Sequence, residues 1–233
     1  MEVLGVRIDN FSKKEILEKI EFFLSEDKFH QIATVNPEFI LRALKDDYFR
    51  RILNSSELNV ADGIGIKYAF LRKNSWLKLR IAGVDFIEEV LRIANEKKLG
   101  VFFAITCDGL SSFKEIKNVL QKKYPNIKIG GGDLDPRKNK KWPVVYKYSI
   151  VFCNFGFPQQ EKFIFQQKND TIRIAMGVGG SFDFLTGKIT RAPKLIRLFG
   201  LEWLWRLALE PRYRFKRIIN AVIVFPIRVL FNR

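Results

Sequence analysis

Three polar side chains that could do chemistry follow two predicted strands of this sequence. Thr34 and Asn36 lie two residues apart at the end of one strand, so their side chains share a face and could both hydrogen-bond sugar hydroxyls. Asp62 follows a short apolar strand and precedes a glycine, where its carboxylate could take a proton from a hydroxyl group. Two alternatives stay open, because Asn36 and Asp62 could each cap the helix that comes after it.

A second polar group lies further along the chain. Gln160 and Glu161 open a predicted helix, whose exposed N–H groups favour an anion and where an amide side chain could bind a base or a ribose. Glycines that would let a ligand approach the backbone closely follow the next strand: Gly177, Gly179 and Gly180. Asp183 comes directly after them and could bind a ribose or cap a turn.

The elements that must position these residues alternate between strands and helices. Strand patterns cover residues 2–8, 30–35, 58–61, 101–106, 127–129, 149–154 and 171–176. Helical patterns lie between them, at 64–71, 85–95, 113–122 and 159–167 and after the predicted caps Ser12 and Asn36. This alternation predicts an α/β fold with a Rossmann-like, mostly parallel sheet flanked by helices. Such sheets bind ligands beyond the carboxyl ends of their strands, where all these polar residues lie.

Charge is concentrated at the end of the chain. The protein has a net charge of +16, and residues 188–233 contribute eleven Lys or Arg against two acids, or +9. Apolar residues recur there at helical spacing and are interleaved with the cations. We therefore predict two parts, a catalytic α/β domain at 1–191 and a basic, amphipathic helical appendage at 192–233 that associates with a membrane.

The sequence leaves several surfaces open as the partner of this appendage. Its apolar run at 218–231 is shorter than the roughly 20 residues that a spanning helix needs, which favours an interfacial element on anionic lipid. Packing on the protein's own core, or on a second subunit in a homo-oligomer, would also explain the apolar stripe. A basic nucleic-acid-binding protein is the alternative from another class, although the chain carries no recognised nucleic-acid motif, and we expect no nucleic-acid partner.

Metal and thiol chemistry are disfavoured. Cys107 and Cys153 lie in apolar runs that predict buried strands, so we expect two buried thiols and no disulfide. His30 is the single histidine. Asp133 and Asp135 have a spacing that holds a divalent metal in other transferases, but their setting among Gly and Pro indicates a turn. We therefore predict no metal site.

Four segments, in order along the chain, resemble the WecG/TagA/CpsF family of bacterial glycosyltransferases. They read TVNPE at 34–38, ADGIG at 61–65, FGFPQQE at 155–161, and GVGGSFD at 177–183 with Gly187 and Arg191-Ala-Pro193 after it. The segments GLEWL at 200–204 and EPR at 210–212 resemble the end of the family pattern. The resemblance covers about residues 1–217 and therefore most of the chain.

This resemblance implies an inverting, metal-independent transfer from a UDP-sugar to an undecaprenyl-diphosphate-linked acceptor, without any cofactor. The best-known members transfer N-acetylmannosamine to lipid-linked N-acetylglucosamine in wall teichoic acid synthesis, and relatives use other sugars for capsule or exopolysaccharide. The chain opens on an alternating strand pattern with no basic n-region followed by an apolar h-region, so we expect no secretory signal and a cytoplasmic protein. The resemblance implies a peripheral position on the inner face of the cell membrane.

The resemblance also assigns roles to residues. Asp62 becomes the expected base with Thr34 beside it, and Asn36 and Arg80 become substrate contacts, the arginine through paired hydrogen bonds to a diphosphate. The remaining expected substrate contacts are Gln160, Glu161, Gly177, Gly179, Gly180 and Asp183. Arginines of the appendage are expected to approach the diphosphates, and the matching positions are Arg212, Arg214 and Arg217. The segments 104–109 and 130–140 depart from the family pattern, which could alter the choice of donor.

Overall fold

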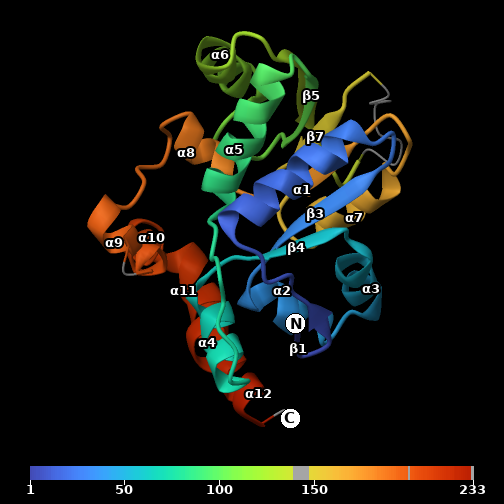
Figure 1. Cartoon of the computed structure of the whole chain (residues 1–233). Coiled ribbons are helices and arrows are strands. Elements are labelled where there is room, and N and C mark those ends of the chain that lie inside the picture. The colour runs from blue at the N-terminus through green and yellow to red at the C-terminus, as the bar shows by residue number, and fades with distance from the viewer. Residues whose placement is uncertain (139–146, 199, 232–233) are drawn as a thin grey trace.

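The computed structural model describes residues 1–138, 147–198 and 200–231 and confirms the predicted α/β class (Figure 1). Six parallel strands form the central sheet in the order β4-β3-β8-β7-β5-β6. Their bounds are β3 His30–Val35, β4 Leu58–Ala61, β5 Gly100–Thr106, β6 Lys128–Leu134, β7 Ile150–Cys153 and β8 Ile174–Gly177. Because all six run in one direction, their carboxyl ends meet at one edge of the sheet.

Helices cover both faces of this sheet. One layer contains α1 Lys13–Ser25, α5 Gly83–Glu96, α6 Phe113–Lys123 and α8 Ser181–Leu185. The other contains α2 Pro37–Ala43, α3 Asp47–Ser55, α4 Ile64–Arg72 and α7 Gln159–Gln166. Alternation along β3 supplies both layers, since Ile32 packs into the first and Ala33 into the second. The strand ends are therefore held rigidly from two sides.

Helix starts follow the predicted caps where the sequence signal is strong. Ser12 forms a capping box with Glu15, and the Asn36 side chain caps α2. The sequence analysis missed α3, although the Asp46 carboxylate accepts from the Phe49 N–H at 3.0 Å and makes a regular N-cap. The sequence signals of that helix are the cap residue Asp46 and the apolar residues Phe49, Ile52 and Leu53 that follow it at helical spacing.

The first predicted strand, at 2–8, is instead a hairpin. Its strands are β1 Glu2–Val3 and β2 Val6–Arg7, and they pair antiparallel. Leu4 and Gly5 form the turn with φ of 49° and 81°. Two consecutive left-handed residues are what a tight hairpin turn needs, and the alternating pattern concealed them.

Two further predictions need correction. The segment 130–134, expected as a loop, continues β6, because its glycines let the Tyr148 ring and the Phe103 backbone approach closely. Residues 139 and 140, at the end of the segment 130–140 that departs from the family pattern, lie outside the described part of the chain. Cys153 is buried as predicted, whereas Cys107 is exposed, since β5 ends one residue before it.

The tail beyond residue 191 is helical and lies against the second layer (Figure 1). Its elements are α9 Lys194–Leu198, α10 Glu202–Leu209, α11 Pro211–Ile219, the π-helical turn η1 Asn220–Val224 and α12 Phe225–Phe231. Gly200, at φ of 73°, lies between α9 and α10. Phe225 is fully buried in the core formed by α2 and α4.

A notch at Gly65 receives this aromatic ring. A Cβ atom at Gly65 would lie 2.6 Å from Pro37 Cγ and 3.3 Å from Phe225 Cδ1, so three segments meet where no side chain fits. The tail is thus packed on its own core, which is one of the alternatives left open by the sequence. No helix within the described ranges has both the length and the hydropathy to cross a bilayer.

Candidate active site

One cavity of about 900 Å³ opens at the carboxyl edge of the sheet. The ends of five strands and the loops after them form its floor, and they contribute Thr34, Asn36, Asp62, Gly63, Thr106, Asp108, Asn154, Gly177 and Gly179. Tail helices form its roof, with Glu202, Trp203, Arg206, Glu210, Arg214 and Arg217. The sheet therefore brings the two polar groups of the sequence together, and the tail closes the space above them.

Asp62 lies on the floor, where its backbone N–H donates to Val35 O at 2.8 Å. Gly63, at φ of 88°, is the N-cap of α4 and makes no side-chain cap, so the structure does not use Asp62 to cap that helix. Burial raises the pKa of Asp62 to about 6, and the Glu202 carboxylate adds to the rise while Arg80 and Arg206 oppose it. A carboxylate with this pKa is ionised at pH 7 yet basic enough to take a proton.

Three other predicted residues surround this carboxylate. Thr34 is nearly buried at 8% exposure, and Asn36 accepts from the Glu38 and Phe39 N–H groups at 2.9 and 3.1 Å. Asn36 is therefore a helix cap, as the alternative held, while its amide also lines the cavity. Arg80 lines the cavity too and donates to the Arg197 carbonyl at 3.4 Å.

The predicted pair at the start of α7 divides between the wall and the interior. Gln160 lines the cavity, and its Oε1 accepts from the Gly179 N–H at 3.1 Å. Glu161 is 2% exposed and lies behind Gln160, outside the residues that line the cavity. Gly177 and Gly179 both line the wall.

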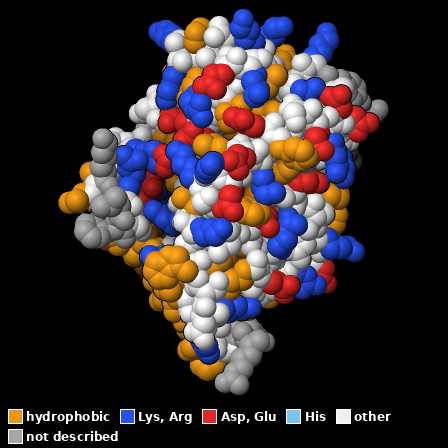
Figure 2. Space-filling model, viewed as in Figure 1, with side chains coloured by type: hydrophobic (Ala, Val, Ile, Leu, Met, Phe, Trp, Pro, Cys, Tyr) orange, Lys and Arg blue, Asp and Glu red, His pale blue; other side chains and the backbone are white. Residues whose placement is uncertain are grey.

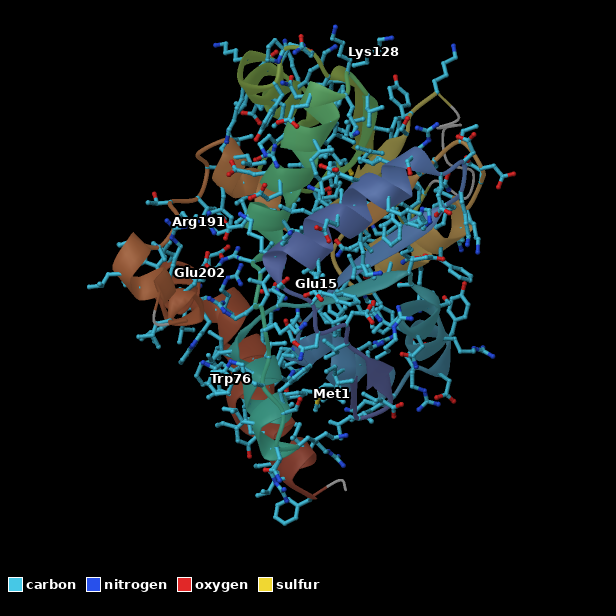
Figure 3. The ribbon with its side chains drawn as sticks, in the orientation of Figure 1. Met1, Glu15, Trp76, Lys128, Arg191 and Glu202 are labelled. Atoms are coloured by element: carbon cyan, nitrogen blue, oxygen red, sulfur yellow. The ribbon has the colours of Figure 1, made fainter. Side chains whose placement is uncertain are left out.

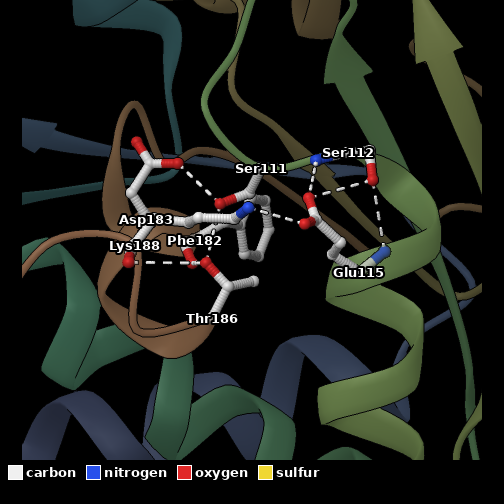
Figure 4. Close-up of polar contacts among 7 residues, drawn as sticks. All are labelled: Ser111, Ser112, Glu115, Phe182, Asp183, Thr186 and Lys188. Atoms are coloured by element: carbon white, nitrogen blue, oxygen red, sulfur yellow. Dashed lines mark hydrogen bonds and ion pairs between the residues drawn. The ribbon is translucent and has the colours of Figure 1, made fainter.

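Asp183 has a structural partner on another element (Figure 4). Its Oδ1 accepts from the Ser111 hydroxyl at 2.8 Å, and that hydroxyl also contacts Thr186 at 2.7 Å. These bonds tie α8 to the loop ahead of α6. The residue still lines the cavity together with Gly180.

The roof carries a cluster of cations. Arg214 Nε donates to Glu210 Oε2 at 2.6 Å, and Arg217 Nε donates to Glu38 Oε2 at 2.7 Å, which links α11 to α2. Arg212, predicted with them, is exposed and is not among the residues that line the cavity. Helical spacing explains the split, because residues 212 and 214 point to different sides of one helix.

Sequence reasoning missed Arg206 and Glu202, which also line the cavity. Arg206 lies over the Phe184 ring at 4.8 Å, and its pKa falls to about 10, mainly through burial and secondly through repulsion by Arg214. The positions 206, 210, 214 and 217 recur at steps of four, four and three, a helical spacing that was readable in the sequence, although the structure divides them between α10 and α11. Glu202 was part of the GLEWL segment but was given no role.

A second network holds Glu202 at the roof. Arg191 makes two bonds to the Asp85 carboxylate, at 2.7 and 2.6 Å, and its Nε lies 3.7 Å from Glu202 Oε1. Figure 3 labels Arg191 and Glu202 in neighbouring positions between the tail and the core. Arg191, the last residue before the tail, therefore connects α5 to α10.

Among the described residues, no group of three His, Cys, Asp or Glu side chains is arranged to hold a metal ion. Asp133 accepts from the Phe113 N–H at 2.7 Å, and Asp135 pairs with Arg137 at 3.1 Å. Both carboxylates of the candidate metal pair thus have protein partners. Arg80, Arg206, Arg214 and Arg217 line the cavity, and burial raises the pKa of the lining carboxylate Asp62, a combination that suits transfer from a phosphorylated donor.

The sequence matches the family described as Glycosyl transferase WecG/TagA/CpsF over residues 1–233. The chain belongs to this family. It is a glycosyltransferase of the hexosyltransferase type, and the resemblance seen in its motifs is confirmed.

Two relatives carry more specific names. A Bacillus subtilis (strain 168) protein is 37% identical over 196 residues, which cover 81% of this chain and 75% of the relative. A Staphylococcus aureus (strain MRSA252) protein is 29% identical over 238 residues, which cover 98% of this chain and 91% of the relative. Each is named N-acetylglucosaminyldiphosphoundecaprenol N-acetyl-beta-D-mannosaminyltransferase.

Proposed function

We propose that this glycosyltransferase moves N-acetylmannosamine from its UDP-sugar to N-acetylglucosamine linked to undecaprenyl diphosphate, as a step of wall teichoic acid synthesis. The names of the two relatives support this choice of sugar and acceptor. The observation that carries the reaction is the cavity itself, which is lined by Asp62 on its floor and by Arg206, Arg214 and Arg217 on its roof.

The proposed chemistry is a single displacement. Asp62 takes the proton from the attacking hydroxyl of the acceptor sugar, whose oxygen forms a bond to the anomeric carbon of the donor. The bond from that carbon to the UDP oxygen breaks, and the configuration inverts. Arginines beside the departing diphosphate stabilise the charge that develops on it. Because they supply this charge, we propose that the transfer needs no metal ion or other cofactor.

Positions on the floor suggest how the substrates are divided. Thr34 and Asn36 adjoin Asp62 and are proposed to contact the transferred sugar, while Arg80 holds the diphosphate. The nucleotide is assigned to the glycine-lined wall, which comprises Gln160, Gly177, Gly179, Gly180 and Asp183. Close backbone approach favours a planar base or a ribose there.

Release of UDP tests this function. Purified protein is mixed with UDP-N-acetylmannosamine and a lipid-diphosphate N-acetylglucosamine acceptor in EDTA, and release is compared with and without the acceptor. Acceptor-dependent release that survives EDTA is the expected result. Release only after magnesium is restored would contradict metal independence, and no release with either would point to another UDP-sugar or another acceptor.

We further propose that the tail docks on the inner face of the cell membrane. The tail exposes several apolar side chains: Phe215, Val222, Ile223, Ile227, Leu230 and Phe231. Helix α4 and the segment after it expose further apolar side chains, Tyr68, Leu71 and Trp76. Figure 2 shows apolar atoms on the surface where Figure 3 labels Trp76. Arg212, Lys216 and Arg228 are exposed among them and suit anionic headgroups.

Flotation with vesicles checks this docking. Binding to vesicles that contain anionic phospholipid, weakened by high salt and by Phe231→Ser, is the expected outcome. A duplex DNA competitor that displaces the vesicles would instead favour a phosphate-backbone surface. Equal mass before and after Phe231→Ser in light scattering would separate lipid docking from a homo-oligomer that uses the same face.

A further inference from the structure

Glu161 is a buried carboxyl group that the proposed chemistry does not use. It lies in the first turn of α7 at 2% exposure, among the apolar residues of the second helical layer. Burial raises its pKa to about 7. Its Oε2 is buried without a hydrogen-bond partner among the described residues, whereas Oε1 has one.

That single partner is Gln160. Gln160 Nε2 donates to Glu161 Oε1 at 2.7 Å, and Gln160 Oε1 accepts from the Gly179 N–H at 3.1 Å. The two bonds fix which end of the amide faces which way, because a backbone N–H must meet an oxygen and the carboxyl oxygen must meet the amide nitrogen. An amide nitrogen has two hydrogens, so one remains for the cavity that Gln160 lines.

The surroundings hold the pair tightly. A Cβ atom at Gly177 would lie 2.5 Å from Gln160 Nε2 and 2.6 Å from Glu161 Oε1, so β8 leaves room for the pair only because residue 177 is glycine. From the other side, Gln31 Nε2 donates to the Glu161 backbone carbonyl at 3.3 Å. That contact supports the backbone of α7 without touching the carboxyl group.

We propose that Glu161 is a positioning residue, which locks the amide of Gln160 so that its remaining N–H faces an oxygen of the nucleotide. Glu161 itself does not reach the cavity and acts only through Gln160. This inference rests on the proposed function, because it takes the glycine-lined wall to be the nucleotide site. Within the FGFPQQE segment it assigns Glu161 to orientation and Gln160, which is also buried but lines the cavity, to contact.

Calorimetric titration with UDP tests the proposal in a double-mutant cycle. Glu161→Met, which keeps the volume but removes the acceptor, should weaken UDP binding about tenfold, the size expected for one lost or misdirected hydrogen bond. Gln160→Ala should weaken it similarly. In the Gln160→Ala background, Glu161→Met should have no further effect.

Two more variants act as controls. Glu161→Gln keeps an acceptor oxygen and resembles the neutral acid, so it should bind UDP within about threefold of wild type. Gln31→Met removes the support of the α7 backbone and leaves the carboxyl group in place, so it should lower thermal stability but not UDP affinity. If Glu161→Met does not fold, Gly177→Ala displaces the same pair from β8 and should be equally non-additive with Gln160→Ala.

The outcomes separate the two proposals. The positioning role would be overturned if Glu161→Met and Gln160→Ala lowered UDP affinity additively. It would also be overturned if Gln31→Met lowered UDP affinity as much as Glu161→Met does. In both cases UDP binding by the wild type would still support the proposed enzyme. Failure of the wild type to bind UDP would overturn both.

Discussion

The floor and the roof of the cavity are built on different principles. Floor residues sit at the ends of parallel strands, where backbone bonds such as Asp62 N to Val35 O at 2.8 Å place them and two helical layers hold the sheet. In α10 of the roof, whose eight residues are all described, no side chain is fully buried. Ion pairs and the Phe225 ring hold that roof to the core.

The two constructions suit the two tasks proposed for them, proton transfer on the floor and charge stabilisation at the roof. A general base must be fixed within reach of one proton, and a sheet edge provides that precision. Stabilising a diphosphate requires several cations nearby, which long side chains on a more loosely packed helix pair can supply.

The largest effect is expected from the floor. Asp62→Asn should lower turnover about 1,000-fold, since the amide cannot take the proton, while the fold persists. UDP release gives the rate and circular dichroism the fold. The matched control is Asp133→Asn, another carboxylate at the sheet edge but outside the cavity lining, which should stay within a fewfold of wild type. Wild-type turnover by Asp62→Asn would end the assignment of the base.

A smaller loss is expected from the roof. Arg206→Met should lower turnover about 100-fold, because one cation facing the leaving diphosphate is removed while its apolar stem remains. Arg212→Met is the control, since the sequence placed that residue in the site and the structure leaves it exposed. Equal losses in the two variants would mean that the basic tail acts through its overall charge and not through a built site.

The attachment of the roof can be weakened separately. Phe225→Ala should destabilise docking of the tail by about 3–5 kcal/mol, the usual range for a buried phenylalanine, without unfolding the sheet. Hydrogen exchange should then rise in α10 to α12 and stay low in β3 to β8. Phe215→Ala, at an exposed position of the same tail, should leave exchange unchanged. Protection lost uniformly across the chain would show that floor and roof unfold as one unit.

The smallest effect concerns pH. Activity should rise through about pH 6 as Asp62 loses its proton, because its pKa is raised by burial and by Glu202. Glu202→Gln removes a neighbouring negative charge and should move this limb to lower pH. The same raised pKa makes the Asp62 contribution to stability greatest at low pH and lost as pH rises toward 6. A limb that moves upward in Glu202→Gln would contradict this coupling.

The parallel sheet and the polar residues at its edge could be predicted from the sequence. Parallel strands follow from strict alternation, and the residues after each strand must then share one edge, which located Thr34, Asn36 and Asp62 together. The family motifs added their expected roles. The side of α7 on which Glu161 lies was not predicted. Whether this residue points to the cavity or to the interior depends on how α7 packs against β8, and a sequence pattern does not contain that information.

The tail shows the same limit. Its cations were recognised, but Arg212 was chosen where Arg206 lines the cavity, because the choice depends on how α10 and α11 rotate against the core. Cys107 was placed in the interior because its apolar run continues past the end of β5. Predictions from local pattern therefore succeed for the floor, which is set by the sheet, and weaken for surfaces set by tertiary contact.

The notch at Gly65 has a consequence for engineering. Gly65 lies in the first turn of α4, three residues after Asp62, and the ring that it receives comes from a segment about 160 residues later. A chimaera that combines this sheet with another enzyme's tail would therefore have to present an aromatic ring of matching size at the position of Phe225. The tail can therefore be exchanged only together with the notch at Gly65. A designer would choose the source of a new tail by the fit of its aromatic ring to this notch before considering its charge.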